Sequence, residues 1–243
     1  MTTGLAQEQQ LDGGLASRPV AELHGMLAAG EEVLECYRVL SKAGLNTVGE
    51  CLKDQGTFYE FDHYPKGDVY DNETHSQYYY HAHRSEAGEH GHFHTFVRAK
   101  GMPPGVQCAD YDGEEAWPEG DEALSHLVGI SMDRYGYPTD LFTTNRWVTG
   151  ETWYPCGDVI QMLDAFEMDH AFPSWAVNRW ITALLRLFRP TIEVLLRERD
   201  AAIEAWRRKH PGVDVFEDRE LELTSRTPIS VESQIAAIQA VLG

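Results

Sequence analysis

Residues 78–97 read YYYHAHRSEAGEHGHFHTFV and hold five of the 11 histidines of this 243-residue chain. Two aromatic-rich runs of alternating character, Gln77–Arg84 and Gly91–Arg98, flank a short polar stretch, Ser85–His90, that contains a glycine. Such a pattern predicts two antiparallel strands joined by a loop of several residues. We therefore expect the fold to be built around a β-hairpin.

The predicted hairpin places its histidines on one face. Successive side chains of a strand point to opposite sides of the sheet, so His81 and His83 share one face of the first strand. By the same rule, His92, His94 and Phe96 share one face of the second. If the last residue of the first run lies opposite the first residue of the second, then His83 faces His92. The next pair is His81 with His94, with Cβ atoms about 5 Å apart. A shift of one residue would separate the two pairs.

Four imidazoles brought together in this way predict a metal site. Packed imidazoles repel one another once protonated, and a transition metal relieves this by taking a lone pair from each. We expect three or four of the set to bind one ion, namely His81, His83, His92 and His94. A buried or catalytic histidine cluster without metal, and a surface tract without function, stay open as alternatives. Semi-apolar residues alternate with the histidines and favour a folded sheet: Tyr80, Ala82, Phe93 and Thr95.

Other residues could complete the site. His126, in a second predicted hairpin, is the next candidate metal ligand. Tyr79 is expected to share the histidines' face, where its phenol could donate a hydrogen bond or a proton near a bound substrate. Glu89 is the carboxylate that we expect to take part in catalysis. Further candidate ligands are His63, His75, Glu86, Glu89 and His90. The carboxylates of Asp68, Asp71 and Glu73 could accept N–H bonds from ligand imidazoles.

The ligand types favour some metals and activities over others. A histidine set suits iron, copper, nickel or zinc, and the absence of thiolate ligands disfavours a structural zinc centre. We expect iron or copper, with zinc or nickel as alternatives, in an oxidoreductase that acts on a small molecule enclosed by tyrosines and by Trp147 and Trp153. A non-catalytic metal-binding or metal-sensing module and a metal-free interaction protein remain alternatives, and oligomeric state is open.

Charge excludes some partners. The formal net charge is −19, and residues 60–125 alone carry 14 acids against four bases. Binding to nucleic acid or to an anionic membrane needs clustered cations, so we expect neither. The four cysteines are widely spaced without a C-x-x-C motif, which predicts reduced thiols. No apolar run is long enough to span a bilayer and no secretory signal is evident, so we expect a cytoplasmic protein.

Element patterns predict the α+β class, with an antiparallel sheet of hairpins flanked by N-terminal and C-terminal helices. Residues 1–17 are expected to form a disordered leader, followed by a single metal-binding domain, 18–243. Its predicted parts are helices in 18–55, a sheet in 57–150 and helices in 156–243. Within these, we expect strands at Thr57–His63, Leu124–Asp133, Thr139–Trp147 and Val213–Leu223, a turn at 65–68, a helix break at Pro190, and a last helix opened by Thr227 and Pro228.

Two resemblances bear on these expectations. The strings HYPKGDVYD (63–71), YYYHAHR (78–84) and EHGHFHTF (89–96) resemble those of an uncharacterised bacterial protein family over roughly residues 57–150, which carries no activity with it. His-x-His on an antiparallel sheet is also similar to cupin barrels and implies a half barrel, with His126 as a third ligand on a later strand. The cupin carboxylate spacing is not met, because Glu86 falls short of it and Glu89 lies beyond it.

Overall fold

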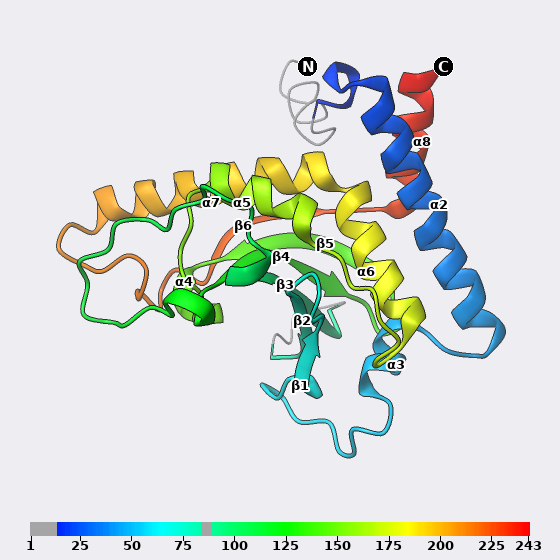
Figure 1. Cartoon of the computed structure of the whole chain (residues 1–243), viewed down its shortest axis with the longest axis horizontal. Helices are drawn as coiled ribbons and strands as arrows, with labels where there is room; N and C mark the ends of the chain where they lie inside the picture. Colours follow the sequence, from blue (N-terminus) through cyan, green and yellow to red (C-terminus); the bar gives the residue numbers. More distant parts are fainter. Residues whose placement is uncertain (1–13, 84–88) are drawn as a thin grey trace.

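A six-stranded antiparallel sheet forms the centre of the protein, as the computed structural model of residues 14–83 and 89–243 shows (Figure 1). Each strand pairs with the next along the chain, in the order β1 to β6. The predicted α+β class is confirmed. The strands are β1 (Tyr64–Tyr70), β2 (Ser76–His81), β3 (Gly91–Arg98), β4 (Leu124–Met132), β5 (Pro138–Thr144) and β6 (Leu223–Pro228).

Helices flank the sheet in sequence and in space. α5, α6 and α7 lie along one side of the sheet, and α2 and α8 lie side by side at one end (Figure 1). The predicted break at Pro190 is confirmed, because one residue, Phe188, separates the end of α6 from the start of α7, beside that proline. The helices are α2 (Val20–Lys42), α3 (Thr47–Leu52), α4 (Arg146–Thr149), α5 (Cys156–Met162), α6 (Trp175–Leu187), α7 (Arg189–Lys209) and α8 (Val231–Leu242). Short 3-10 turns are η1 (Leu15–Ser17), η2 (Ala99–Gly101), η3 (Gly120–Glu122) and η4 (Leu163–Ala165).

The helix-covered face of the sheet holds the hydrophobic core. Phe93 of β3 packs against Trp180 of α6 with ring centroids 5.5 Å apart, and the Tyr78 hydroxyl donates to Asn178 Oδ1 at 2.6 Å. Because strand side chains alternate, the neighbours of these core residues point to the other face. That other face is the one that carries the histidines.

The first strand lies later in the chain than predicted. Thr57–His63 is not a strand; β1 begins at Tyr64 and contains the predicted turn 65–68 as a bulge between its pairs with β2. Pro65 has no N–H to donate, and Gly67 and Asp68 have positive φ angles of 88° and 61°. Residues with these properties interrupt the regular hydrogen-bond ladder between two strands. The residues that predict a turn therefore form a bulge within β1.

A bulge in β4 overturns a second prediction. Thr95 of β3 pairs with Val128, whereas the next residue, Phe96, pairs with His126, so Leu127 is the extra residue. The sequence alternation predicts His126 on the face of Val128 and Ile130. The bulge instead turns His126 to the opposite face, beside the histidines of β3.

The C-terminal elements also differ from prediction. The predicted strand Val213–Leu223 is wrong: β6 begins at Leu223, where the backbone pairs with β5. The last helix begins at Val231 rather than at Thr227, with Ser230 accepting a hydrogen bond from the Ser233 N–H. β6 (Leu223–Pro228) therefore adds an edge strand to the sheet from the residues between the predicted strand and the body of the predicted last helix.

At the N-terminus, most of the predicted leader, residues 1–13, lies outside the described residues. Leu15–Ser17 forms η1, with Leu15 buried, so disorder is the wrong prediction for these three residues. In the part of the chain that the structure describes, no helix is both long and apolar enough to cross a membrane. All four cysteines are free thiols.

Candidate metal centre

Three buried histidines from two neighbouring strands form the candidate centre. His81 ends β2, and His92 and His94 lie on β3. One ring nitrogen of each lies within 4.8 Å of the others, and the three side chains are almost fully buried. Three imidazole nitrogens at this spacing can meet on a single transition-metal ion.

The hairpin register differs by two residues from the one predicted. His81 pairs with His92, and Tyr79 pairs with His94. A shift of two preserves which face each side chain occupies, so the predicted convergence of histidines holds despite the wrong partners. The pairing of His83 with His92 is wrong, and so is the strand at Ala82 and His83, because β2 ends at His81. Arg84, the last residue of the predicted strand, lies outside the described residues.

His83 lies next to the three-histidine group, beyond the end of β2. Its ring centroid is 5.0 Å from those of His81 and His92, and the ring of Phe61 stacks on it at 5.4 Å. Phe61 has a φ of 70°, an unusual conformation for a bulky side chain. Ligation by His83 stays a prediction.

A buried carboxylate orients one of the imidazoles. Glu89 Oε1 lies 2.5 Å from His92 Nδ1, while His92 Nε2 lies 2.8 Å from His81 Nε2. An acceptor on Nδ1 fixes the ring and leaves Nε2 to face the centre, the usual arrangement behind a metal-binding histidine. Glu89 was predicted to act in catalysis, but the structure places its carboxylate behind His92. The other oxygen, Oε2, accepts a hydrogen bond from the Ser131 hydroxyl at 3.2 Å and lies 3.8 Å from Arg226 Nη2.

A second polar chain reaches His94. His126 Nε2 lies 3.0 Å from His94 Nδ1, and the backbone N–H of His126, freed by the bulge, donates to Glu151 Oε2 at 2.6 Å. Burial, with the nearby Arg199 charge, lowers the pKa of His126 to about 3. Burial raises the pKa of Glu151 to about 7, against the opposing charge of Arg199. His126 is therefore neutral at pH 7 and supports His94 from behind.

Tyr79 lies where the sequence predicts, on the histidines' face. Its ring centroid is 5.2 Å from those of both His81 and His94, and the His63 imidazole stacks on its outer side at 3.6 Å. Burial raises the pKa of Tyr79 well above its usual value, so its phenol stays protonated. His63 Nδ1 in turn lies 3.0 Å from Asp68 Oδ1. This is the acceptor role predicted for Asp68, although His63 lies outside the three-histidine group.

Phe142 of β5 packs beside the three-histidine group. Its ring centroid lies 5.3 Å from that of His92 and 5.6 Å from that of His94. Phe142 pairs with Gly129 of β4, where any side chain would collide with the Phe142 ring. Glycine at this position is therefore what admits an apolar ring next to the imidazoles.

Several other predicted residues serve elsewhere. His75 Nδ1 meets the Tyr70 hydroxyl at 2.5 Å, and His90 Nδ1 meets the Tyr80 hydroxyl at 2.7 Å. Asp71 accepts backbone N–H bonds from Glu73, Thr74 and Asp169, a structural role, and Glu73 is exposed. Trp153 packs with Phe216 in a separate cluster, and Trp147 stacks with Arg219, so neither encloses the centre. Glu86 lies outside the described residues.

Four residues at the site were not predicted. Ser131, Phe142, Glu151 and Arg226 come from β4, β5, the segment after α4, and β6. No local spacing in the sequence joins them to the histidine hairpin. Only the successive pairing of β3 with β4, β4 with β5 and β5 with β6 brings these strands together beside the hairpin.

Comparison with known proteins assigns the chain to a family. A family model described as a domain of unknown function, DUF6969, matches residues 27–229. No curated protein and no solved structure matches the chain. The match covers all six strands and every residue of the candidate centre.

Proposed function

The chain belongs to this DUF6969 family, whose description names no activity, and we propose from the site alone that it binds one transition-metal ion through His81, His92 and His94. The observation that carries the proposal is the convergence of three buried ring nitrogens within 4.8 Å. Glu89 behind His92 and His126 behind His94 support it, because such partners fix ligand rings.

We further propose that the bound metal is iron or copper and that the protein is an oxidoreductase acting on a small molecule. Three imidazoles leave coordination positions for water or substrate, as catalytic sites require. The Tyr79 phenol beside two of the histidines supports this, as a protonated donor next to such a position. Free thiols at all four cysteines support a reducing compartment such as the cytoplasm.

Metal loading tests the proposal. The protein, purified without a histidine tag, should hold about one transition-metal ion per chain by elemental analysis. A His81→Ala/His94→Ala variant should lose it, whereas His24→Ala/His210→Ala, which changes two histidines outside the centre, should keep it. Circular dichroism of each variant checks folding. Full occupancy in the first variant would overturn the proposed site.

The same preparation distinguishes an enzyme from a carrier. Azide added to the loaded protein should change its optical or paramagnetic spectrum, because an open coordination position accepts a small ligand. An unchanged spectrum would indicate a closed coordination shell, as in a storage or sensing module. If the bound metal is zinc, a hydrolytic or structural role would replace the proposed oxidoreductase activity.

A further inference from the structure

A cavity of about 600 Å³, lined by charged and aromatic residues, opens beside the candidate centre. It is formed by the irregular segment before β1 and by the β1 bulge. The residues of its lining that matter here are Tyr59, Asp62, His63, Tyr64, Lys66 and Asp68. Its size exceeds that of an amino-acid-sized molecule, so such a ligand would fit.

Hydrogen bonds hold the walls of this cavity in place. The buried Tyr64 hydroxyl accepts from the Tyr59 N–H at 2.7 Å, and the Lys66 N–H donates to Gln55 Oε1 at 2.8 Å. Asp68 Oδ2 accepts from the Gln77 side chain at 2.6 Å. Hydrogen bonds of this kind keep a pocket formed before its ligand binds, which lowers the free-energy cost of ordering the pocket.

His63 is shared between the cavity and the centre. It lines the cavity on one side, and its ring stacks on Tyr79 at 3.6 Å and lies 5.6 Å from the ring of His81. A molecule that contacts His63 from the cavity is therefore one side chain away from the three-histidine group.

Two opposite charges of the lining have no ion-pair partner among the described residues. Asp68 is engaged by His63 and Gln77, but neither Asp62 nor Lys66 forms an ion pair with a residue in the described ranges, 14–83 and 89–243. A carboxylate and an ammonium on one cavity wall complement a ligand that carries both charges. The exposed ring of Tyr59 offers apolar surface and a face for a cation, and the buried Tyr64 forms part of the cavity wall.

We propose that this cavity is the substrate pocket of the metal centre and that it binds small zwitterions carrying an ammonium and a carboxylate group. Asp62 binds the ammonium, Lys66 binds the carboxylate, and the two tyrosines pack against the body of the molecule. The link to catalysis rests on the proposed function, whereas the pocket's charge preference does not.

Three probes with one skeleton test the charge preference: phenylalanine, phenethylamine and 3-phenylpropionate. Calorimetric titration of the metal-free and the metal-loaded protein should show phenylalanine binding most tightly. Asp62→Asn should lower the affinity for phenylalanine and phenethylamine about three- to fivefold, as expected for one partly exposed ion pair. It should leave the affinity for 3-phenylpropionate unchanged. Lys66→Gln should lower the affinity for phenylalanine and 3-phenylpropionate and leave the affinity for phenethylamine unchanged.

Matched controls are Asp121→Asn and Lys100→Gln, two residues that pair with each other at 2.9 Å and do not line the cavity. They should alter none of the three affinities. Equal affinity for the three probes, no binding, or equal effects of control and test variants would overturn the proposal. Phenylalanine should also change the spectrum of the cobalt-loaded protein. If phenylalanine binds as expected but the protein takes up no metal when metal is supplied, the proposed metal function fails while the zwitterion site stands.

Discussion

Glu89 is the residue on which the geometry of the centre depends most directly. Its carboxylate meets His92 Nδ1 at 2.5 Å and is itself held by Ser131, with Arg226 nearby. An ionised acceptor increases the basicity of the ring and sets which nitrogen faces the metal. We therefore infer that Glu89 positions His92 in the proposed metal centre.

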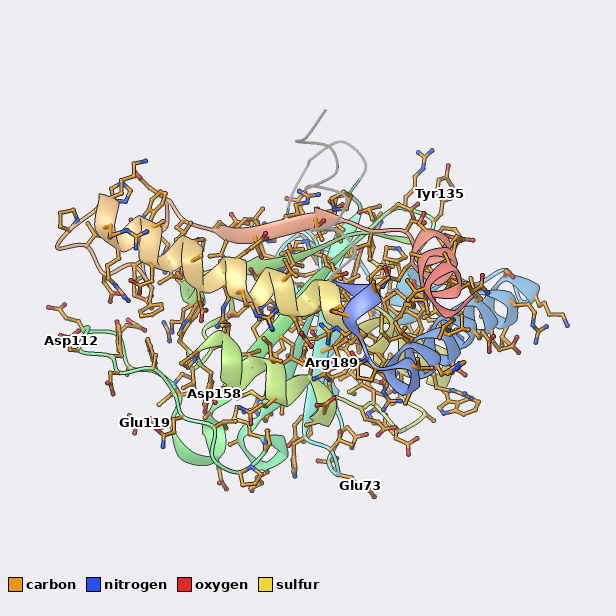
Figure 2. All side chains as sticks on the ribbon, turned by 90° about the horizontal axis from the view of Figure 1, so that it is seen from above. Glu73, Asp112, Glu119, Tyr135, Asp158 and Arg189 are labelled. Atoms are coloured by element: carbon orange, nitrogen blue, oxygen red, sulfur yellow. The ribbon has the colours of Figure 1, made fainter. Side chains whose placement is uncertain are left out.

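This role predicts the effect of Glu89→Gln. The amide can still accept a hydrogen bond but carries no charge, so the affinity for cobalt should fall about 10- to 100-fold. Competition with a metal-binding dye measures the affinity. Glu119→Gln, an exposed acid drawn at the rim of Figure 2, should leave it unchanged. Equal affinities of Glu89→Gln and the unchanged chain would show that His92 needs no orienting carboxylate.

At the scale of elements, alternation within a strand could be predicted and pairing between strands could not. His81, His92 and His94 were placed on one face correctly, because period two is a local property of each run. The register was wrong by two residues, and the face of His126 was wrong because of the bulge at Leu127. Both depend on contacts with neighbouring strands. The sequence does not predict Glu151 at the site for the same reason.

The β4 bulge has a consequence for acid stability. It buries His126 with a pKa of about 3, far below the 6.5 of an ordinary histidine. The unfolded chain therefore binds this proton more readily, and the stability that the neutral ring contributes is lost as pH falls from about 6.5 toward 3. Glu151, with a raised pKa of about 7, acts in the opposite direction, since its contribution is lost as pH rises from about 4.5 to 7.

His126→Gln separates the two contributions. Relative to the unchanged chain, the metal-free variant should gain stability as pH falls below about 6.5, by at most about 1.4 kcal/mol per pH unit. Urea unfolding between pH 7 and 4 measures the difference. His24→Gln, exposed on α2, is the matched control and should show no such trend. A constant difference across the range would contradict a depressed pKa at His126.

At the scale of the whole molecule, the chain carries a large excess of acids. The formal net charge is −19, and residues 60–125 contribute 14 acids against four bases. Glu73, Asp112 and Glu119 point outward from their loops (Figure 2), so these carboxylates act at long range and not as ligands. A field of one sign concentrates counter-ions near the surface and speeds their capture.

This field makes metal capture sensitive to salt. The association rate of cobalt(II) should fall as ionic strength rises from about 0.01 to 1 M, because the screening length shortens from about 30 to 3 Å. The dissociation rate should change little, since it depends on the three buried imidazoles, which salt screens weakly. Stopped-flow absorbance measures both rates. Asp110→Asn/Asp112→Asn/Glu114→Gln should reduce the salt dependence without altering dissociation. An association rate that does not respond to salt would show that the acidic surface plays no part in bringing the metal to the site.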